Sequence, residues 1–385
     1  MPTAKIMVAY GTRPEAIKLA PVIKALRDDS RFESVIVSTG QHREMLQQVT
    51  DLFGFTPDVE LNLMHKKQPL NRIMSRALKR LDEVLKKHKP DVLVVQGDTS
   101  TAAAAAIAGF NREAKIVHVE AGLRSWDLSS PFPEEANRKI ISAIASLHLT
   151  PTKSAKQNLL NEGIDPDRIL VTGNTVIDAL RETVHKTSAL SDPRICEALE
   201  KYSQRIIVTS HRRENLPALS AIGSAIGHLA REYPDTTFLL PMHMNPKIRK
   251  RLLPAIEGLD NVVTTGPLPY DQFMHLMQEA TLIVTDSGGV QEEAPALGLP
   301  ALLIRDTTER PEAIDAGAVK LIGSDPQAII SEVENLLENP AAYEAMRHAV
   351  NPFGDGAATP RIISALDALA AARPLDGIAE FQARY

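Results

Sequence analysis

The chain has 385 residues, which exceeds the usual length of one domain and suits two. Apolar residues make up 44% and charged residues 24%, as in ordinary globular proteins. The net charge of −5 argues against a general binder of nucleic acid or of anionic membranes, since both need a basic surface.

A single cysteine, Cys196, excludes internal disulfides and a multi-thiolate metal site, and it fits a reducing compartment. The N-terminus lacks the apolar stretch of a signal peptide, and the alanine-rich run at 101–110 is far shorter than the roughly 20 residues that span a bilayer. We therefore expect a cytoplasmic protein without nucleic-acid or membrane partners.

Short apolar segments, many of them β-branched, alternate with amphipathic segments along the chain. A first series of predicted strands covers residues 6–10, 34–38, 92–96, 116–119, 147–150 and 169–171. A second series covers residues 205–209, 238–240, 262–264, 282–285 and 301–304. Helical patterns lie between them, for example at 15–27, 70–87 and 219–232. Strands that are apolar on both faces and separated by helices indicate parallel sheets, so we predict two doubly wound α/β domains.

The residues between the two series predict where the domains divide. The segment Thr172–Thr175 is followed by a helical pattern and by a polar stretch at 185–203, and we place the boundary there. The alanine-rich run at 101–110 is interpreted as a helix packed tightly against a sheet.

Polar and glycine residues follow nearly every predicted strand. In open parallel sheets the carboxyl ends of the strands line the ligand crevice. Because both series carry such residues, we predict a site in a cleft between the two domains. The residues are Gly11, Arg13, Gly40, Gln41, His42, Arg43, Gly97, Asp98, Thr99, Glu120, Ser210, His211, Arg212, Arg213, His243, Asp286, Ser287, Gly288 and Gly289.

The turn Ser287-Gly288-Gly289 has the features of a phosphate site, because free N–H groups at a helix start and the helix dipole attract anions. A carboxylate about one helical turn later could hold a ribose diol. The alternative is a helix capped by Asp286 or Ser287, and spacing alone does not choose between the two.

The segment Gly11–Pro14 also favours an anion. The glycine lets the backbone approach a ligand, and Arg13 would point its planar guanidinium at phosphate from the first helical turn. Lys18 lies one turn deeper and could add charge. The alternative is a solvated arginine in a loop.

The segment Ser210–Asn215 places the potential cations His211, Arg212 and Arg213 after an apolar strand. Held over a diphosphate, these groups would stabilise a departing anion. The alternative is an Arg–Glu pair on a surface loop, which contributes little energy. The position at a strand end favours function.

Three carboxylates are candidates for acid–base chemistry. Asp98 and Glu120 end successive strands of the series and should lie near one another, and Glu134 follows the stiff segment 131–133. Carboxylates crowded in a cleft acquire raised pKa values and can move protons near neutral pH. Each alone would more often be a helix cap or a solvated group.

Several motifs are absent. No strand is followed by G-x-G-x-x-G, and neither G-x-x-x-x-G-K-[ST] nor H-E-x-x-H occurs. The histidines show no metal-ligand spacing. Nicotinamide-dependent chemistry, P-loop nucleotide hydrolysis and zinc catalysis are therefore not expected.

Taken together, the motifs resemble those of the non-hydrolysing UDP-N-acetylglucosamine 2-epimerases, in family order from Tyr10 to about Gly323. The matching segments are GTRPEAIKLAP, TGQHREML, QGDTST, HVEAGLRSWDLSSPFPEEANR, TGNTVIDAL, SHRRENL, PMHMNP, DSGGVQEEAPALGLP and RDTTERPEA, and NPFGDGAATPRI continues the likeness.

The resemblance implies the glycosyltransferase-B architecture, in which the active site lies between two Rossmann-like domains. These would cover residues 1–172 and, for the UDP-binding domain, 173–365. A last helix at about 366–385 would pack back on the first domain. The family also implies a homodimer that needs no metal or redox cofactor.

The implied activity is that of an isomerase acting on UDP-N-acetylglucosamine and UDP-N-acetylmannosamine. No carbonyl acidifies the C2 proton, so UDP leaves from C1 as that proton goes, giving 2-acetamidoglucal, and then returns while a proton reaches the opposite face. By motif, the resemblance assigns acid–base chemistry to Asp98, Glu120 and Glu134, and it places Lys18 and His211 in the active site. It implies that Glu293 holds the ribose. The residues expected to bind the diphosphate are Arg13, His211, Arg212, Ser287, Gly288 and Gly289.

One departure concerns a second, regulatory site. Regulated members bind another UDP-N-acetylglucosamine with a glutamine and an arginine where this chain has Glu44 and Lys67. Gln41, His42 and His243 match the family. Glu44 adds negative charge near an anionic ligand and Lys67 lacks a bidentate fork, so activation by substrate is expected to be weak or absent.

Three rival readings remain open at this stage. The hydrolysing sister enzyme would release UDP and free N-acetylmannosamine. A glycosyltransferase of the same architecture would need an acceptor. A UDP-sugar-binding module without catalysis would not depend on Asp98.

Overall fold

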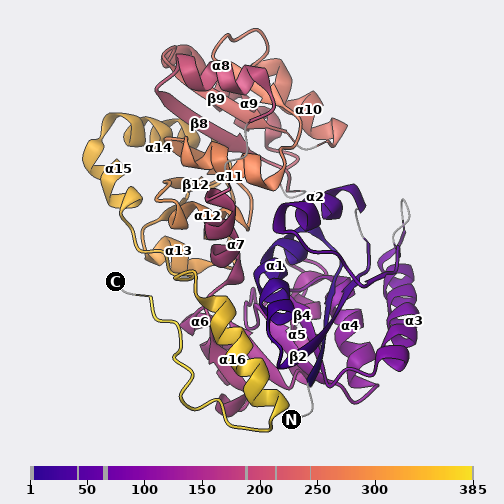
Figure 1. Ribbon diagram of the computed structural model, residues 1–385. Helices are drawn as coiled ribbons and strands as arrows, with labels where there is room; N and C mark the ends of the chain where they lie inside the picture. The colour runs from indigo at the N-terminus through magenta and orange to yellow at the C-terminus, as the bar shows by residue number, and fades with distance from the viewer. Residues whose placement is uncertain are drawn as a thin grey trace. The chain divides into compact units, whose positions relative to one another are not determined.

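The computed structural model describes residues 4–40, 43–63, 68–186, 190–212, 215–242 and 244–383, and for residues 43–45 only the backbone (Figure 1). The chain forms two compact units. The first takes residues up to Arg181 together with Phe353–Ala383, and the second takes Glu182–Pro352.

The first unit contains, among its described residues, a seven-stranded parallel sheet in the order β3-β2-β1-β4-β5-β6-β7. Its strands are β1 (Ala4–Tyr10), β2 (Phe32–Ser38), β3 (Val59–Glu60), β4 (Val92–Gln96), β5 (Lys115–Val119), β6 (Leu147–Thr150) and β7 (Ile169–Val171). Its helices are α1 (Arg13–Asp28), α2 (Arg43–Phe53), α3 (Leu70–His88), α4 (Ser100–Phe110), α5 (Glu134–Ile144), α6 (Lys153–Asn161), η1 (Pro166–Arg168), most of α7 (Thr175–Val184) and α16 (Ala358–Ala370).

The second unit contains, in its described part, a six-stranded parallel sheet in the order β10-β9-β8-β11-β12-β13. Its strands are β8 (Gln204–Thr209), β9 (Thr236–Pro241), β10 (Val262–Thr265), β11 (Leu282–Thr285), β12 (Ala301–Leu303) and β13 (Val319–Leu321). Its helices are α8 (Pro193–Lys201), α9 (Leu219–Glu232), α10 (Pro246–Leu252), η2 (Leu253–Ala255), α11 (Tyr270–Gln278), α12 (Val290–Ala296), α13 (Pro311–Asp315), α14 (Pro326–Glu338) and α15 (Pro340–Arg347).

The predicted fold class, two Rossmann-like parallel-sheet domains, is confirmed. Every predicted strand is present, and sequence reasoning missed only the short edge strands β3 and β13 of the described chain. Edge strands are partly exposed and carry a weaker apolar pattern than central strands. In each sheet the strand order reverses at one place, between β1 and β4 and between β8 and β11, and such a switch point is where open α/β sheets bind ligands.

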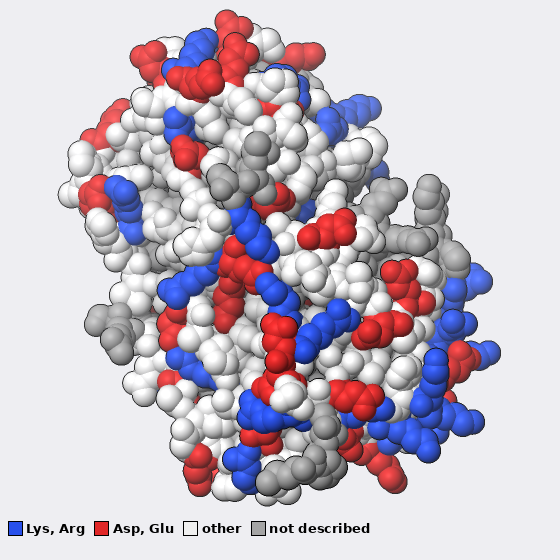
Figure 2. Space-filling view, in the orientation of Figure 1, with Lys and Arg blue, Asp and Glu red and all other residues white. Residues whose placement is uncertain are grey.

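Helix α4 confirms the interpretation of the alanine-rich run. Its residues Ala102–Ala106 are buried, and small side chains allow the helix to lie close to the sheet. A Cβ on Gly109 would come within 2.6 Å of Leu93 Cδ2 and 2.8 Å of Ile116 Cδ1, so a larger residue would force these side chains to move. On the surface, Figure 2 shows Lys and Arg side chains gathered over α3 and over α10.

The C-terminal segment belongs to the first unit, where α16 lies beside α1 (Figure 1). Asp178 of α7 accepts from the N–H groups of Ala358 (3.3 Å) and Thr359 (2.8 Å) at the start of α16. The helix ends at Ala370, earlier than the predicted 366–385, because Pro374 and a positive-φ glycine, Gly377, follow it. The first unit likewise runs to Arg181 rather than to residue 172.

Two histidines face each other inside the first sheet, since His118 of β5 is in register with His148 of β6 and both are fully buried. His118 Nε2 lies 2.8 Å from the Gly97 carbonyl oxygen, whereas neither ring nitrogen of His148 has a hydrogen-bond partner among the described residues. Burial lowers the pKa of His118 to about 4 and that of His148 to about 3. Both rings are therefore neutral in the folded protein at neutral pH.

We expect the free energy of unfolding to fall as the pH drops from about 6.5 to about 4. In this range the unfolded histidines, with pKa values near 6.5, bind protons that the folded rings do not, so stability rises with pH. His148→Leu should reduce the stability difference between pH 7 and pH 5 by about 2 kcal/mol, measured by urea unfolding. The exposed His228, changed to Gln, serves as control. An unchanged pH dependence in His148→Leu would contradict this assignment.

Candidate functional site

The first helix begins with a capping box at the end of β1. The hydroxyl of Thr12 accepts from the N–H of Glu15 (3.4 Å), while Glu15 Oε2 accepts from the N–H groups of Thr12 (2.6 Å) and Gly11 (3.1 Å). A Cβ on Gly11 would lie 2.4 Å from Thr39 Oγ1, so any other residue at this turn would displace the Thr39 side chain. Arg13 is therefore held, half-buried, as the first residue of α1.

Glu15 also joins this turn to the neighbouring strand of the switch point. The hydroxyl of Thr99, just after β4, donates to Glu15 Oε1 at 2.9 Å. Burial raises the pKa of Glu15, although its hydrogen bonds oppose that effect. Glu15 was not predicted as a residue of this site, although the Thr-x-x-Glu spacing of Thr12 and Glu15 is the sequence signature of a capping box.

The carboxylate of Glu120 is fixed by two side chains. Lys18 Nζ lies 2.6 Å from Glu120 Oε2, and Gln96 Nε2 donates to the same oxygen at 2.6 Å. Both side chains of the ion pair are less than a tenth exposed. Glu120 has a left-handed backbone, with φ of 61°, and non-glycine residues adopt this conformation at a cost that recurs at functional sites. Lys18, predicted to add charge for phosphate, is thus paired with a carboxylate.

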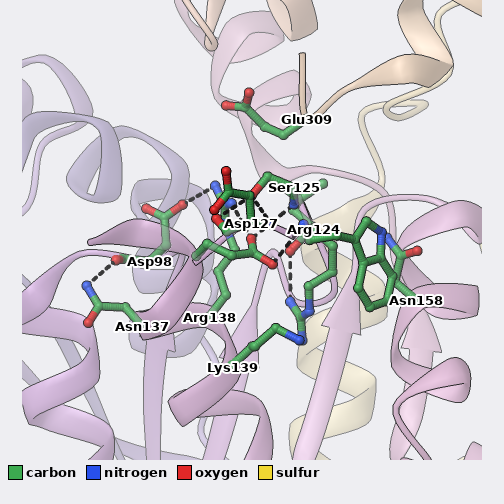
Figure 3. Close-up of polar contacts among 12 residues, drawn as sticks. Asp98, Arg124, Ser125, Asp127, Asn137, Arg138, Lys139, Asn158 and Glu309 are labelled. Carbon is green, nitrogen blue, oxygen red and sulfur yellow. Dashed lines mark hydrogen bonds and ion pairs between the residues drawn. The ribbon is translucent and has the colours of Figure 1, made fainter. Parts of the chain in front are cut away.

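Asp98 follows β4 and is held by helix α5. Arg138 donates through NH2 to Asp98 Oδ2 at 2.5 Å, and Asn137 Nδ2 donates to the Asp98 carbonyl oxygen at 2.8 Å (Figure 3). Asp98 remains about a quarter exposed, whereas Arg138 is buried. The carboxylate is therefore rigidly oriented and still reachable, as acid–base chemistry needs.

Arg138 connects Asp98 to the loop before α5. Its NH1 donates to Glu135 Oε2 at 3.1 Å, and Glu135 accepts in turn from the N–H groups of Ser125 (3.0 Å) and Trp126 (3.3 Å). Glu134 is the first residue of α5 and half-buried, preceded by the Phe132–Pro133 bond, which is cis.

In this unit the predicted residues Arg13, Asp98, Glu120 and Glu134 thus lie at neighbouring strand ends or at the start of the helices that follow them. Strands β4 and β5 are adjacent, as predicted for Asp98 and Glu120. What sequence reasoning missed is that each of these two carboxylates has its own cation. Arg138 lies within a quoted motif but carries no local signal of its partner, which is 40 positions away in sequence.

Asp286 organises the switch point of the second unit. It is fully buried, follows β11, and accepts from the Ser210 hydroxyl (2.8 Å), from the N–H groups of His211 and Arg212 (3.0 Å each) and from Asn215 Nδ2 (3.1 Å). The segment after β8 is therefore tied to the end of β11 through one carboxylate. Asp286 does not cap α12 as the alternative reading proposed.

His211 presents its ring beside this carboxylate, with Nδ1 at 3.0 Å from Asp286 Oδ1 and about two fifths of the side chain exposed. Burial alone would raise the pKa of Asp286, but the hydrogen bond and charge of His211, with the donors above, lower it to about 2. Asp286 is thus ionised at neutral pH, and its carboxylate lies against Nδ1 of the His211 ring.

The glycine turn after β11 lies against two guanidinium groups. A Cβ on Gly288 would be 3.1 Å from Arg310 NH1 and 3.2 Å from Arg212 NH2. Both arginines contact Glu309, at 2.7 Å for Arg310 and 3.8 Å for Arg212. Burial would raise the pKa of Glu309, but the charges of Arg310, Arg305 and Arg212 hold that pKa below its usual range.

Helix α12 starts at Val290, and its N-cap residue Gly289 makes no side-chain cap hydrogen bond. Ser287 precedes this helix and donates its N–H to Thr285 Oγ1 at 3.0 Å. Glu293 lies in the first turn and is buried. A turn of glycines beside two arginines is suited to phosphate, because backbone N–H groups and bidentate guanidinium groups both bind it.

Several predicted residues lie outside the described part. These are Gln41, His42, Lys67, Arg213 and His243, together with the side chains of Arg43 and Glu44. The regulatory site therefore stays a prediction.

Among the residues that the structure describes, no three His, Cys, Asp or Glu side chains gather as a metal site would require. No described helix is both long and apolar enough to cross a membrane.

The sequence profile described as UDP-N-acetylglucosamine 2-epimerase matches residues 24–367 of the chain. The UDP-N-acetylglucosamine 2-epimerase of Yersinia pestis is 46% identical over 368 residues, which are 94% of this chain and 98% of that protein. Its counterpart in Escherichia coli strain K12 is 45% identical over 368 residues, with the same coverage of 94% and 98%.

Solved structures of UDP-GlcNAc 2-epimerases are also similar to this chain. The UDP-GlcNAc 2-epimerase of Neisseria meningitidis, bound to UDP-GlcNAc, superposes with a TM-score of 0.88 at 44% identity, covering 94% of this chain and 99% of that chain. The enzyme of Methanocaldococcus jannaschii in complex with UDP-GlcNAc and UDP superposes with a TM-score of 0.81 at 34% identity, with coverage of 94% and 99%. The chain therefore belongs to the UDP-N-acetylglucosamine 2-epimerase family.

Proposed function

We propose that the protein interconverts UDP-N-acetylglucosamine and UDP-N-acetylmannosamine without net hydrolysis. The observation that carries this proposal is the pair of cation-held carboxylates, Asp98 with Arg138 and Glu120 with Lys18, at the carboxyl ends of the neighbouring strands β4 and β5. Family membership supports the substrate.

The chemistry explains why such groups are needed. The C2 hydrogen lies next to no carbonyl of the ring, so a base removes it only as the C1–oxygen bond breaks and UDP leaves with the electron pair. The product of this step is 2-acetamidoglucal. UDP then adds back to C1 while an acid delivers a proton to the opposite face of C2.

In the proposed assignment, Asp98, Glu120 and Glu134 supply the acid–base groups. The detached UDP is a polyanion that must stay bound, which suits Arg13, His211, Arg212 and the turn Ser287–Gly289. Glu293 holds the ribose.

A proton-NMR time course with UDP-N-acetylglucosamine in heavy water tests the proposal. We expect a stable mixture of the two UDP-sugars, with deuterium at C2 of both. Continuous accumulation of UDP and free N-acetylmannosamine would instead establish the hydrolysing reaction. No exchange at C2 without an added acceptor would favour a glycosyltransferase.

Arg138 is expected to position Asp98 during turnover. Arg138→Ala removes the group that bridges Asp98 and Glu135, and small displacements of a catalytic group cost rate, so kcat should fall about 100-fold with little change in KM. Added guanidinium ion should restore part of the rate by occupying the vacated space.

The matched control is Arg112→Ala, which breaks an exposed bidentate pair with Asp82 (2.6 and 2.7 Å). It should leave kcat unchanged. If Arg138→Ala keeps its wild-type kcat, or if guanidinium gives no rescue while the melting temperature is unchanged, the positioning role is wrong.

Initial rates against UDP-N-acetylglucosamine concentration should follow a hyperbola, because Glu44 and Lys67 replace the regulatory glutamine and arginine. A sigmoidal curve that becomes hyperbolic in Gln41→Ala would show that substrate activation survives.

We further propose that the enzyme is a cytoplasmic homodimer that serves cell-surface polysaccharide synthesis. Light scattering, which measures the mass of the particle in solution, tests the dimer.

A further inference from the structure

A second charged pocket lies in the second unit, away from its switch-point residues in sequence. It is open, has a volume of about 650 Å³, and is lined by Ser220, Ser224, Lys247, Lys250, Arg251, Pro254 and Ala255. This volume is within the range of small-molecule sites. Three of its lining residues are cations and two carry hydroxyl groups, and no carboxylate lines it.

The cations come from one face of α10. Lys247, Lys250 and Arg251 stand at helical spacings of three and four residues, while Ile248 and Leu252 on the other face are buried. None of the three cations forms an ion pair with a carboxylate in the described part of the chain. Like charges at this spacing repel each other, so an anion bound among them would relieve that repulsion. Figure 2 shows the resulting basic surface over α10 on a chain whose net charge is −5.

The wall opposite these cations is held rigidly. A Cβ on Gly227 of α9 would lie 2.3 Å from the Ala255 carbonyl oxygen, and one on Gly223 would lie 2.8 Å from that of Leu252. The two glycines therefore let α9 pack directly against the backbone of the α10–η2 segment. This contact keeps the hydroxyls of Ser220 and Ser224 beside the cations of α10.

We propose that this pocket binds a phosphate-bearing anion at a site separate from the residues assigned to the epimerase reaction. Several cations suit the oxygens of a multiply charged phosphate group, and the Ser220 hydroxyl can add a donor, whereas the Ser224 hydroxyl donates to the Ser220 carbonyl oxygen at 3.0 Å. Arg251 also donates to the Leu216 carbonyl oxygen, in the segment that follows Arg212. The two lysines are therefore the cleaner positions for a test.

The probe is inorganic pyrophosphate, titrated by calorimetry into protein that holds one equivalent of UDP, so that the proposed substrate site is occupied and no excess UDP competes for the second pocket. The wild type should bind a further equivalent, and Lys247→Ala/Lys250→Ala should weaken that binding about tenfold or more. Lys320→Ala, which removes a lysine paired with Glu332 (2.7 Å) in the same unit, should bind as the wild type does. An unchanged melting temperature shows that the double variant is folded.

A parallel arm uses phosphatidylglycerol vesicles, with phosphatidylcholine vesicles as the uncharged comparison. Binding of pyrophosphate that depends on the two lysines supports a soluble phosphate ligand. Lysine-dependent binding to phosphatidylglycerol alone supports a lipid phosphodiester as the source of the same group. The proposal is overturned if neither probe binds, or if both bind the double variant as tightly as the wild type.

Discussion

Asp98→Asn should lower turnover of UDP-N-acetylglucosamine by about 10²–10⁴-fold while UDP still binds with nearly its full affinity. The amide keeps the size of the side chain but can neither accept the C2 proton nor donate one as a carboxylic acid. Asp98 lies at the switch point of the first sheet, whereas the residues proposed to grip UDP there and in the second unit stay intact. The loss should therefore appear in kcat.

Turnover and deuterium incorporation at C2 measure the catalytic loss, and calorimetry with UDP measures the binding. Asp82→Asn is the matched control, since it also removes a carboxylate paired with an arginine, on the exposed surface. If Asp98→Asn retains C2 exchange at the wild-type rate, Asp98 is not an acid–base group. If UDP binding is lost as well, the separation of binding from proton transfer fails.

Asp286→Ala should destabilise the protein by about 3–5 kcal/mol and abolish tight UDP binding. The substitution leaves the N–H groups of His211 and Arg212 and the amide of Asn215 without their buried acceptor. Unpaired buried donors are costly, and the segment that presents His211 and Arg212 would lose its anchor. The pKa of Asp286 in the folded protein is about 2, below its ordinary value. The stability that comes from its ionised form is therefore present above about pH 4 and is lost as the pH falls towards 2.

Urea unfolding of the UDP-free protein and calorimetry with UDP measure the two effects. Asp192→Ala is the comparison, because the partly exposed Asp192 caps α8 by accepting from the N–H of Arg194, and its loss should cost only about 1 kcal/mol. Equal destabilisation by the two variants would show that Asp286 is no more than another surface acceptor. Full UDP affinity in Asp286→Ala would dissociate this carboxylate from the site.

The local pattern of apolar residues was enough to predict all strands of the two sheets except β3 and β13. Central strands such as β4, β6 and β11 were predicted with their observed ends, because a strand buried on both faces is apolar throughout and is bounded by polar residues. The edge strands β3 and β13 were not predicted, since two or three partly exposed residues carry no such pattern. The C-terminal helix was predicted at about 366–385 but spans Ala358–Ala370, because Pro374 and the positive-φ residue Gly377 interrupt any helix beyond it.

The sequence by itself determined which residues follow the strands, and hence that Arg13, Asp98, Glu120, His211 and Ser287 lie beyond the carboxyl ends of their strands, the edge at which open α/β sheets bind ligands. Tertiary structure alone decided their partners. Arg138 reaches Asp98, Lys18 reaches Glu120 and the donors after β8 converge on Asp286, across separations of 40 to 102 residues in sequence. The physical reason is that ion pairs and hydrogen bonds depend on distances of about 3 Å, which strand order and helix packing set and which no local pattern encodes.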